Sequence, residues 1–280
     1  MILLIADSGS TKTDWALIAP NITQYITTDG INPIHQDDDA IEYIIVQQLC
    51  PELSNAIPTH IYFYGAGCVG GDTNKRVETL LQQHFTMAHI AISSDLLGAA
   101  RSLCGHQKGI AAILGTGANS CYYNGCEIVA NIPPLGYILG DEGSGASLGK
   151  AFLNRLLRGE LGNELIDEFY ATYNTDYRTL IARIYREPAA NRYLASLSPF
   201  IASQIDNPTL RKVVADTFAT FIERHIMRYN YKQLPLHLTG SIAYHYRNII
   251  AEVAHEKGIE IGNITRSPIE GLIKYHTNNL

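Results

Sequence analysis

The sequence has few cysteines, no long apolar run and no excess of positive charge, and each of these features excludes a class of protein. The cysteines are five, an odd number, and they are scattered without a CxxC pair: Cys50, Cys68, Cys104, Cys121 and Cys126. This usage argues against a disulfide scaffold and predicts a reduced, cytoplasmic protein. No apolar run approaches the roughly 20 residues of a membrane span. A net charge of −6 disfavours a broad nucleic-acid-binding surface.

The composition instead predicts a folded chain with a sizeable core. Hydrophobic residues make up 46% and charged residues 17% of the 280 residues, which excludes a disordered chain. This length suggests one large domain or two modest ones. The apolar start at residues 1–6 has no basic residue and is too short for a signal-peptide core, so no targeting segment is expected.

An architectural repeat is the clearest feature of the chain. Residues 2–28 predict an apolar strand, a loop of small and hydroxyl residues, and two returning strands. Residues 109–132 repeat this order around a second small-residue turn. Two unrelated hairpins would give the same pattern, but we favour an internal duplication. We therefore expect an N-terminal domain of residues 1–106 plus about 266–280, and a C-terminal domain of residues 107–265.

Strands and helices alternate in the rest of the chain, which predicts an α/β protein. Further strands are expected over residues 59–67, 89–95, 234–239 and 259–264, and helices over 37–50, 72–85, 95–104, 207–229 and 268–277. Asp37 and Asn207 are suitable caps for two of these helices. The apolar residues of 207–229 recur at three- and four-residue spacing, which indicates a core-facing stripe rather than a site.

The first candidate site is the loop Asp7-Ser8-Gly9-Ser10-Thr11-Lys12-Thr13. Glycine lets the backbone approach an anion, and successive amides and hydroxyls form a concave donor site for phosphate. Gly9, Ser10, Thr11 and Lys12 are therefore candidate ATP-phosphate contacts. Asp7, at the end of the strand, could hold Mg²⁺ through water. An ordinary hairpin turn explains the same residues, and the P-loop pattern is absent.

Two further glycine turns are weaker signals when each is taken alone. Gly115, Thr116 and Gly117 follow the first strand of the second copy and could form a phosphate clamp together with the first loop. Gly240 and Ser241 lie between a predicted strand and a helix, where a turn can contact a nucleotide base or ribose. Tight packing of the strand on the helix explains this second turn equally well.

Two carboxylates complete the set of candidates. Asp95 closes a strand and opens a helix, so it is either a helix cap or a general base for an acceptor hydroxyl. Asp141 lies in the glycine-rich stretch 136–145. It could accept hydrogen bonds from sugar hydroxyls or help to coordinate magnesium, and a flexible acidic loop is the alternative.

In this order, the segments DSGSTKTDW, GINP, SDLLGAA, LGTGANS and GDEGSGASLG resemble the BadF/BadG/BcrA/BcrD ATPase family. That family belongs to the sugar kinase, Hsp70 and actin superfamily and includes N-acetylglucosamine kinases. The resemblance runs from residue 1 to about 250. It implies an α/β fold of two ribonuclease H-like (actin-like ATPase) domains, with mixed sheets flanked by helices and a cleft between them, and MgATP mainly on the second domain.

The resemblance also implies roles for individual residues. Thr11 and Thr116 match phosphate contacts, Gly240 matches the adenosine motif, and Asp95 matches the base for a sugar 6-hydroxyl. Sugar contacts are implied for a set of four residues: Asn32, Asn119, Gly136 and Asp141. The stretch Leu135-Gly136-Tyr137-Ile138 departs from the animal amino-sugar kinases, which usually carry a tryptophan there. The identity of the sugar therefore stays open.

The expected activity is transfer of the γ-phosphate of MgATP to the 6-hydroxyl of N-acetylglucosamine or a close amino sugar. The alternative is an ATPase that couples hydrolysis to a partner protein, as in the branch of the family that holds an iron–sulfur cluster. The sequence lacks the KCAAGTG-like cysteine segment of that branch. A nucleotide or sugar sensor is a third reading. No nucleic-acid or membrane partner is expected, and the 17 tyrosines are compatible with a homodimer.

Overall fold

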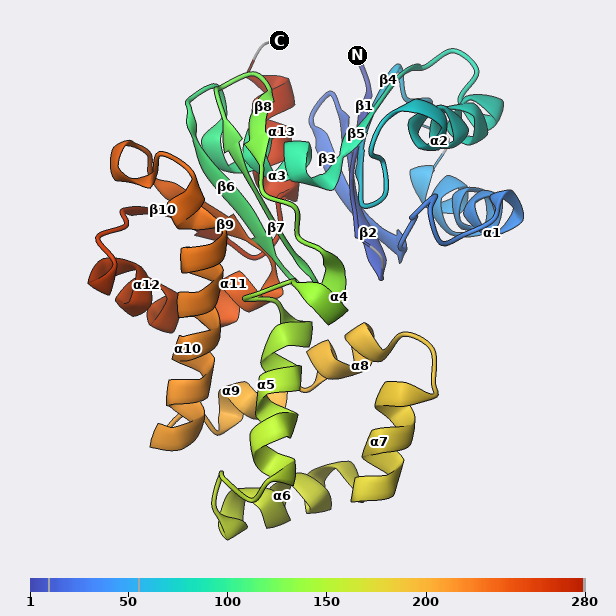
Figure 1. The fold of residues 1–280 in the computed structure, drawn as a ribbon. Coiled ribbons are helices and arrows are strands. Elements are labelled where there is room, and N and C mark those ends of the chain that lie inside the picture. Colours follow the sequence, from blue (N-terminus) through green and yellow to red (C-terminus); the bar gives the residue numbers. More distant parts are fainter. Residues whose placement is uncertain (10, 55, 279–280) are drawn as a thin grey trace. The chain divides into compact units, whose positions relative to one another are not determined.

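The computed structural model describes residues 1–9, 11–54 and 56–278, and its internal contacts divide the chain into two compact units (Figure 1). Unit 1 comprises Met1–Gln107, Gly125–Glu127 and Ser267–Leu280. Unit 2 comprises Lys108–Asn124 and Ile128–Arg266. The C-terminal segment thus returns to the unit in which the chain begins.

Unit 1 is built on a five-stranded sheet with the order β3-β2-β1-β4-β5. Its strands are β1 (Leu3–Ser8), β2 (Lys12–Ala19), β3 (Ile22–Asp29), β4 (His60–Gly65) and β5 (His89–Ser94). The first three strands pair antiparallel, and β4 and β5 continue the sheet in parallel from β1. Successive side chains of β1 enter different cores: Leu4 and Ala6 face one, and Ile5 faces the other. The central strand is therefore apolar on both faces.

Helices cover both faces of this sheet. They are α1 (Asp38–Tyr43), α2 (Gly71–His84), α3 (Asp95–Cys104) and α13 (Ile269–Thr277). Asp37 caps α1 by accepting a hydrogen bond from the Ala40 amide at 2.9 Å, as its position in the sequence predicts. The helix expected over 37–50 continues only as a π-helical segment, Ile44–Leu49, and a 3₁₀ turn, Cys50–Leu53. Pro51 in that turn has no amide hydrogen to extend an α-helix.

Unit 2 repeats the same sheet. Its strands are β6 (Gly109–Leu114), β7 (Ala118–Tyr123), β8 (Ile128–Asn131), β9 (Leu236–Thr239) and β10 (Ile261–Thr265). The order β8-β7-β6-β9-β10 is three antiparallel strands followed by two parallel ones, which matches β3-β2-β1-β4-β5. The repeat expected from the sequence is therefore confirmed at the level of architecture. Both units are mixed sheets flanked by helices, as the ribonuclease H-like prediction requires.

Most of the additional helices belong to unit 2. They are α4 (Gly136–Leu139), α5 (Gly145–Leu157), α6 (Asn163–Tyr173), α7 (Tyr177–Tyr185), α8 (Ala190–Ser196), α9 (Ser198–Ser203), α10 (Pro208–Arg224), α11 (Ser241–His245) and α12 (Arg247–Glu256). Within this unit, α6 and α7 lie far from the sheet, whereas α5 and α10 run beside each other and toward it (Figure 1). These two helices position much of the candidate site.

Helix α10 is shorter than the sequence pattern predicts. Asn207 caps it, accepting hydrogen bonds from the Thr209 and Leu210 amides at 3.0 Å each, but the helix ends at Arg224 rather than at Tyr229. A 3₁₀ turn follows, and it directs the Tyr229 hydroxyl onto Ser120 and the Ile132 amide. The buried partners of Tyr229 explain why the periodic stripe outlasts the helix.

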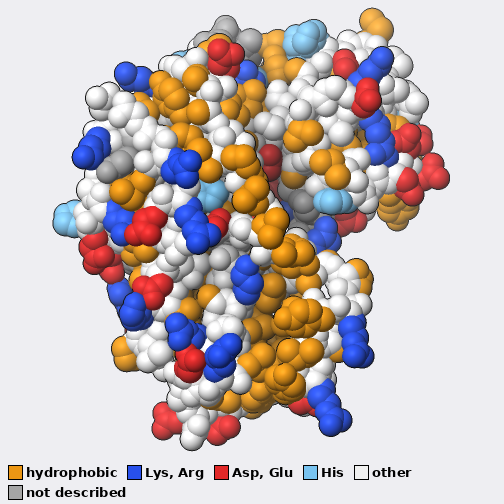
Figure 2. Space-filling model, viewed as in Figure 1, with side chains coloured by type: hydrophobic (Ala, Val, Ile, Leu, Met, Phe, Trp, Pro, Cys, Tyr) orange, Lys and Arg blue, Asp and Glu red, His pale blue; other side chains and the backbone are white. Residues whose placement is uncertain are grey.

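No helix in the described ranges is long and apolar enough to cross a bilayer. Apolar side chains gather on one face of unit 2, over the part of the chain that contains α4 and α6–α8 (Figure 2). Exposed members of this region include Leu135, Ile138, Leu139, Tyr177 and Tyr185.

The packing of α13 on α3 gives a test of the fold of unit 1. A Cβ on Gly271 would lie 2.2 Å from Ser102 Oγ and 2.3 Å from the Ser102 carbonyl oxygen. We expect Gly271→Ala to lower the free energy of unfolding by about 1–3 kcal/mol, the usual cost of overpacking. Trp15, the only tryptophan, is buried in unit 1, so its fluorescence during urea unfolding reports on this unit. Exposed Lys274→Ala in the same helix is the control, and equal stability of the two variants would contradict the packing argument.

Candidate active site

The turn between β1 and β2 is held by its own backbone. The Gly9 amide donates to the Lys12 carbonyl at 3.0 Å, and the Gly30 amide donates to the Thr11 carbonyl at 3.1 Å. Thr11 is exposed, as a ligand-contacting hydroxyl would need to be. Ser10, also a predicted phosphate contact, lies outside the described residues. The turn is therefore a shaped hairpin whose Thr11 side chain is open to solvent.

A buried hydroxyl network connects this turn to the segment that carries Asn32. Ser8 Oγ lies 2.7 Å from Thr13 Oγ1, donates to the Ile31 carbonyl and accepts from the Ile31 amide, both at 3.0 Å. Ser8 and Thr13 are fully buried. Ser8 lies in the predicted phosphate loop but was not among the predicted contact residues. A hydroxyl residue shortly after the continuous apolar run 2–6, directly before Gly9, is the sequence signal that could have indicated its structural role.

Lys12 has a partner inside the protein. Its ammonium donates to the two carboxylate oxygens of Asp14 at 2.9 and 2.6 Å, and the lysine side chain is 62% exposed. A phosphate would have to compete with Asp14 for this charge. The assignment of Lys12 to a phosphate contact stays a prediction.

The charges of Asp7 and Asp95 repel each other near the carboxyl ends of the parallel strands. In the register of the sheet Asp7 aligns with Tyr64, and Tyr64 aligns with Ser93, two residues before Asp95. Two strand spacings are roughly 10 Å. Burial, followed by the charges of Asp95 and Asp14, raises the pKa of Asp7 to about 7. Burial also raises the pKa of Asp95. Two carboxyls with raised proton affinity thus belong to one edge of this sheet.

Asp95 was considered either as a helix cap or as a general base, and the structure assigns the cap to another residue. The cap of α3 is Ser94, whose hydroxyl accepts from the Leu97 amide at 3.2 Å. Asp95 lies in the first turn and accepts from the Leu96 amide at 2.8 Å through one carboxylate oxygen, Oδ1. Since Ser94 already serves as the cap, the helix does not require Asp95 in that role.

Asn32 is fixed by a close approach to Gly67. The Asn32 side chain is buried, and its Oδ1 accepts from the Ile34 amide at 3.0 Å. Gly67 has a φ of +82°, and a Cβ at that position would lie 2.3 Å from Asn32 Oδ1. Glycine is needed here both for the backbone angle and for the space. Gly67 was not among the predicted site residues.

In unit 2, the loop at Gly115–Gly117 is joined to the start of α5. The Gly145 amide donates to the Gly115 carbonyl at 2.8 Å, and the Ala146 amide donates to the Thr116 carbonyl at 3.1 Å. The Ser147 amide donates to Ser144 Oγ, which caps the helix. Two motifs that are almost 30 residues apart in the sequence therefore form one structure.

Asp141 is held against the same loop. It is buried with a φ of +54°, its amide donates to the Pro134 carbonyl at 2.8 Å, and its Oδ1 accepts from the Ala118 amide at 3.4 Å. A Cβ on Gly117 would lie 3.1 Å from Asp141 Oδ2. Burial, with a smaller effect of the Glu142 charge, raises the pKa of Asp141. The Asp141 carboxylate therefore lies beside the Gly115–Gly117 loop, and the nearby positive charges do not fully offset the effect of burial on its pKa.

Gly240 brings a third motif to this loop. Its φ is +112°, and a Cβ would lie 2.3 Å from the Leu114 carbonyl oxygen, directly before Gly115. The Gly240 amide donates to the Thr265 carbonyl at 3.1 Å. Ser241 is exposed at the first residue of α11. Tight packing thus explains Gly240 by itself, and a nucleotide contact stays a prediction.

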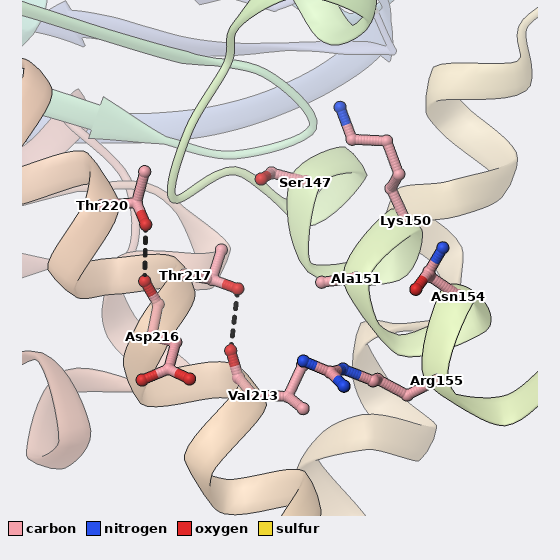
Figure 3. A pocket seen from close by; sticks show the side chains of 9 residues that line it. All are labelled: Ser147, Lys150, Ala151, Asn154, Arg155, Val213, Asp216, Thr217 and Thr220. Atoms are coloured by element: carbon pink, nitrogen blue, oxygen red, sulfur yellow. Dashed lines mark hydrogen bonds between the residues drawn. The ribbon is translucent and has the colours of Figure 1, made fainter. Parts of the chain in front are cut away.

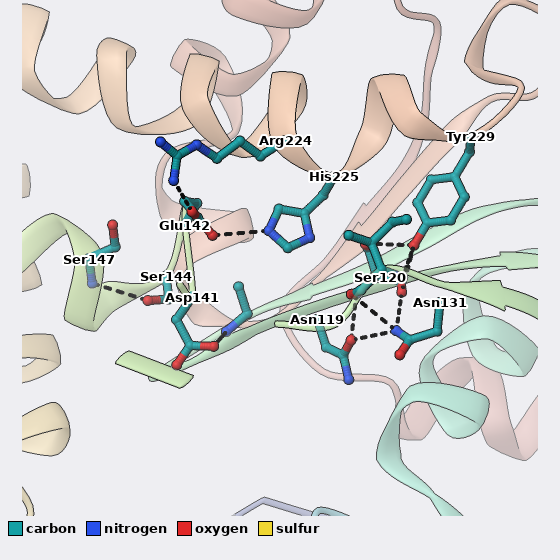
Figure 4. Close-up of polar contacts among 12 residues, drawn as sticks. Asn119, Ser120, Asn131, Asp141, Glu142, Ser144, Ser147, Arg224, His225 and Tyr229 are labelled. Atoms are coloured by element: carbon teal, nitrogen blue, oxygen red, sulfur yellow. Dashed lines mark hydrogen bonds and ion pairs between the residues drawn. The ribbon is translucent and has the colours of Figure 1, made fainter. Parts of the chain in front are cut away.

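Asn119 belongs to a network around Tyr229 (Figure 4). Asn119 Oδ1 accepts from the Ser120 amide and from Asn131 Nδ2, both at 2.9 Å. The Tyr229 hydroxyl lies 3.0 Å from Ser120 Oγ. The amide nitrogen of Asn119 points away from this network in Figure 4. Gly136 has a φ of +72° and open space where a Cβ would lie.

An ion-pair cluster beside Asp141 was not predicted. Glu142 accepts from Arg224 Nη1 at 2.7 Å, and its other oxygen lies 3.1 Å from His225 Nε2 (Figure 4). Burial alone would raise the pKa of Glu142, but hydrogen bonds from His225, the backbone and Arg224 outweigh it and lower the pKa. His225 is buried and stacks on Phe221. This cluster anchors the turn that carries Asp141 to the end of α10.

A pocket of about 370 Å³ lies between α5 and α10 (Figure 3). Its lining residues are Ser147, Lys150, Ala151, Asn154, Arg155, Val213, Asp216, Thr217 and Thr220. Ser147 lies in the turn of α5 that is bonded to the Gly115–Gly117 loop. The pocket therefore begins one helical turn from that loop.

Asp7 and Asp141 are the predicted magnesium ligands. In the described parts of the chain, no group of three or more His, Cys, Asp or Glu side chains is arranged to hold a metal ion by itself. Mg²⁺ commonly retains several waters and takes one or two carboxylates together with substrate phosphates. Single, partly desolvated carboxylates fit an ion of that kind, which would arrive with a nucleotide.

The paired sheets and the loops at their strand ends define the class of protein, a two-domain ribonuclease H-like fold of the actin-like ATPase type. The chain is 43% identical to a protein of Porphyromonas gingivalis described as a "Putative N-acetylglucosamine Kinase", over 99% of both chains and with a TM-score of 0.96. The chain belongs to the N-acetylglucosamine kinase-like branch of the BadF/BadG/BcrA/BcrD ATPase family.

Two more distant structures share the fold. A "Putative N-acetylglucosamine Kinase" of Chromobacterium violaceum is 18% identical, with a TM-score of 0.77 and 98% of both chains covered. The ethanolamine utilization protein EutJ of Carboxydothermus hydrogenoformans is 12% identical, with a TM-score of 0.58 and 97% and 88% of the two chains covered. No family model and no curated protein matched the sequence.

The raised pKa of Asp7 predicts a pH-dependent stability. A carboxyl whose folded pKa is raised from 3.8 to about 7 contributes stability below pH 4, and this contribution is lost as the pH rises toward 7. Asp7→Asn removes the buried charge, so its stability relative to the wild type should increase between pH 4.5 and pH 8. Urea unfolding in metal-free buffer, followed by Trp15 fluorescence, measures the difference.

The matched control is Glu78→Gln, which removes an exposed carboxylate from α2 in the same unit. Its stability relative to the wild type should change little over this pH range. If Asp7→Asn and Glu78→Gln gave the same pH profile, Asp7 would not carry a buried charge.

Proposed function

We propose that this protein is an ATP-dependent sugar kinase that phosphorylates the 6-hydroxyl of N-acetylglucosamine or a close amino sugar. The observation that carries the proposal is the joining of the Gly115–Gly117 loop, the Asp141 turn and the start of α5 in unit 2. Family membership supports the same class of reaction, because the Porphyromonas gingivalis relative is described as such a kinase.

In this proposal unit 2 binds the nucleotide. The glycines of the 115–117 loop allow phosphate oxygens to approach the backbone, and the Thr116 hydroxyl is a further donor. The base and ribose would lie along the α5–α10 pocket, whose Ser147 and Thr217 offer hydroxyls. Gly240 and Ser241 would border the nucleoside on the other side of the loop. ATP and magnesium are thus the proposed ligands of this unit.

Unit 1 supplies the acceptor chemistry. A hydroxyl becomes a better nucleophile when a carboxylate accepts its proton in the transition state. Burial raises the proton affinity of Asp95, and its second carboxylate oxygen, Oδ2, is available for a hydroxyl because Oδ1 serves the Leu96 amide. Asn32, held by Gly67, would orient the sugar. Thr11 at the open turn and Asp7, through magnesium-bound water, would complete the phosphate environment.

The proposed reaction conserves charge and atoms in one displacement. The sugar 6-oxygen forms a bond to the γ-phosphorus while the bond from that phosphorus to the bridging oxygen of ADP breaks. Asp95 takes the hydroxyl proton, and ADP leaves with the bridging oxygen. Bound magnesium would offset phosphate charge. Asn119, Gly136 and Asp141 would hold sugar hydroxyls.

A cytoplasmic location and a homodimer are further parts of the proposal.

The direct test is ADP release by the purified protein with magnesium and ATP, with and without a panel of amino sugars. We expect release that depends on sugar, together with a 6-phosphate product identified by NMR. ADP release that is indifferent to every sugar would instead indicate an ATPase coupled to a partner protein. Binding of nucleotide or sugar without any ADP release would instead indicate a sensor.

Asp95→Asn tests the base. It should reduce kcat by about 10²–10⁴-fold, the usual contribution of general base catalysis, while MgADP binding stays within about twofold of the wild type. Exposed Asp72→Asn in α2 is the control and should retain full turnover. A variant Asp95→Asn with most of its turnover would remove Asp95 from this role.

Gly67→Ala tests the positioning of Asn32. The added Cβ must displace the Asn32 amide, so the KM for the sugar should rise about tenfold, in line with the loss of a polar contact of about 1.4 kcal/mol, while MgADP binding is unchanged. Gly70→Ala is the matched control, because Gly70 also has a positive φ, +100°, but has open space where the Cβ would lie. Equal sugar KM values for the two variants would show that backbone strain alone is responsible.

A further inference from the structure

Lys150 lines the pocket, and its ammonium lies against α4, which leads into the turn that carries Asp141. It lies in the second turn of α5, one turn after Ala146, whose amide is bonded to Thr116. Long helical side chains lean toward the N-terminus of their helix. The Lys150 ammonium accordingly donates to the Tyr137 carbonyl in α4 at 3.0 Å. Figure 3 shows Lys150 and Ser147 on α5, across the pocket from Thr217 and Thr220 of α10.

The other cations near this pocket are already paired. Arg155 forms an ion pair with Glu160, and Lys212 donates to Asp216 at 2.8 and 2.7 Å. In the described part of the chain Lys150 forms no ion pair. Its charge does act on Asp141, whose pKa it lowers against the raising effect of burial. Lys150 is therefore a positive charge between the pocket and the Asp141 turn, with no carboxylate of its own.

The loop itself leaves a phosphate chain in need of a cation. The first amides of α5, at Gly145, Ala146 and Ser147, already donate to the protein. They cannot serve as the helix N-terminal anion site that often binds phosphates. Lys12, the lysine proposed from the sequence, donates to Asp14. Close approach of the backbone gives space for phosphates but supplies no full positive charge.

We propose that Lys150 is a phosphate-binding residue that pairs with the β- and γ-phosphates of the nucleotide; this rests on the proposed function. An ammonium has three donors, of which Tyr137 accepts one. When the sugar oxygen attacks the γ-phosphorus and the bond to the bridging oxygen breaks, negative charge grows on the β-phosphate of ADP. Lys150 stabilises that charge, and it also aids release of the phosphoryl group to the acceptor.

A purely structural role makes a different prediction. If Lys150 only ties α4 to α5, its loss would loosen the turn that carries Gly136 and Asp141. The sugar KM would then rise, and nucleotide binding measured without sugar would not change. A phosphate contact, by contrast, distinguishes nucleotides by their number of phosphates.

The experiment is isothermal titration calorimetry of the full chain with MgADP and with AMP, without sugar. Lys150→Gln should weaken MgADP binding by about 10- to 100-fold, the range of a hydrogen bond to a charged group, and AMP binding by no more than about twofold. Lys150→Arg should recover part of the MgADP affinity. The control Arg158→Gln removes an exposed charge from the other end of α5 and should change neither. Circular dichroism verifies that each variant is folded.

Three outcomes overturn the proposal. MgADP affinity that is unchanged in Lys150→Gln removes Lys150 from the phosphates, whether or not the sugar KM rises. Equal losses for MgADP and AMP place its effect on the pocket rather than on the terminal phosphates. Wild-type protein that binds neither nucleotide would overturn the kinase proposal as well, which separates the two failures.

Discussion

The hydrogen bonds from Gly145 and Ala146 to the Gly115–Gly117 loop are the constraint on which the site in unit 2 depends. They fix the loop to a helix rather than leaving it as a free turn. The same helix also lies close to α8, because a Cβ on Gly149 would lie only 2.1 Å from the Leu194 carbonyl oxygen. A loop holds its geometry more precisely when rigid elements support it. The glycines of the GDEGSGASLG segment thus serve packing as much as flexibility.

In unit 1 the candidate site instead places two carboxyl groups in buried positions, where a charge lowers the stability of the fold. Asp7 and Asp95 are both shielded from solvent, and this burial raises the pKa of each carboxyl. Like charges at one strand edge destabilise the fold, and a cation bound together with a substrate would relieve that cost. Strain of this kind is expected where function, rather than stability, selects the residues. The buried network of Ser8 and Thr13 keeps the surrounding backbone in place.

Local patterns were sufficient to predict most of the fold. Strand and turn signals predicted the strands of both sheets, and the repeated pattern at residues 2–28 and 109–132 predicted the three antiparallel strands that each sheet shares with the other. Capping by Asp37 and Asn207 was readable because a cap acts within three residues. The end of α10 was not, because it is decided by the partners of Tyr229 on β7 and after β8, roughly a hundred residues earlier in the chain.

The same distinction separates the parts of the site. Motifs such as Gly115–Gly117 or the segment around Asp141 can be recognised in the sequence from the spacing of glycines and carboxylates. The partners that hold them do not: Glu142 meets Arg224 and His225 across 82 and 83 residues. Lys150 likewise looks like an ordinary surface lysine of an amphipathic helix until Tyr137 and the pocket are seen beside it. In the proposed site, pairing therefore decides which lysine contacts the phosphates. A lysine with its own carboxylate must exchange one anion for another, whereas one bonded to a carbonyl gains a full charge interaction.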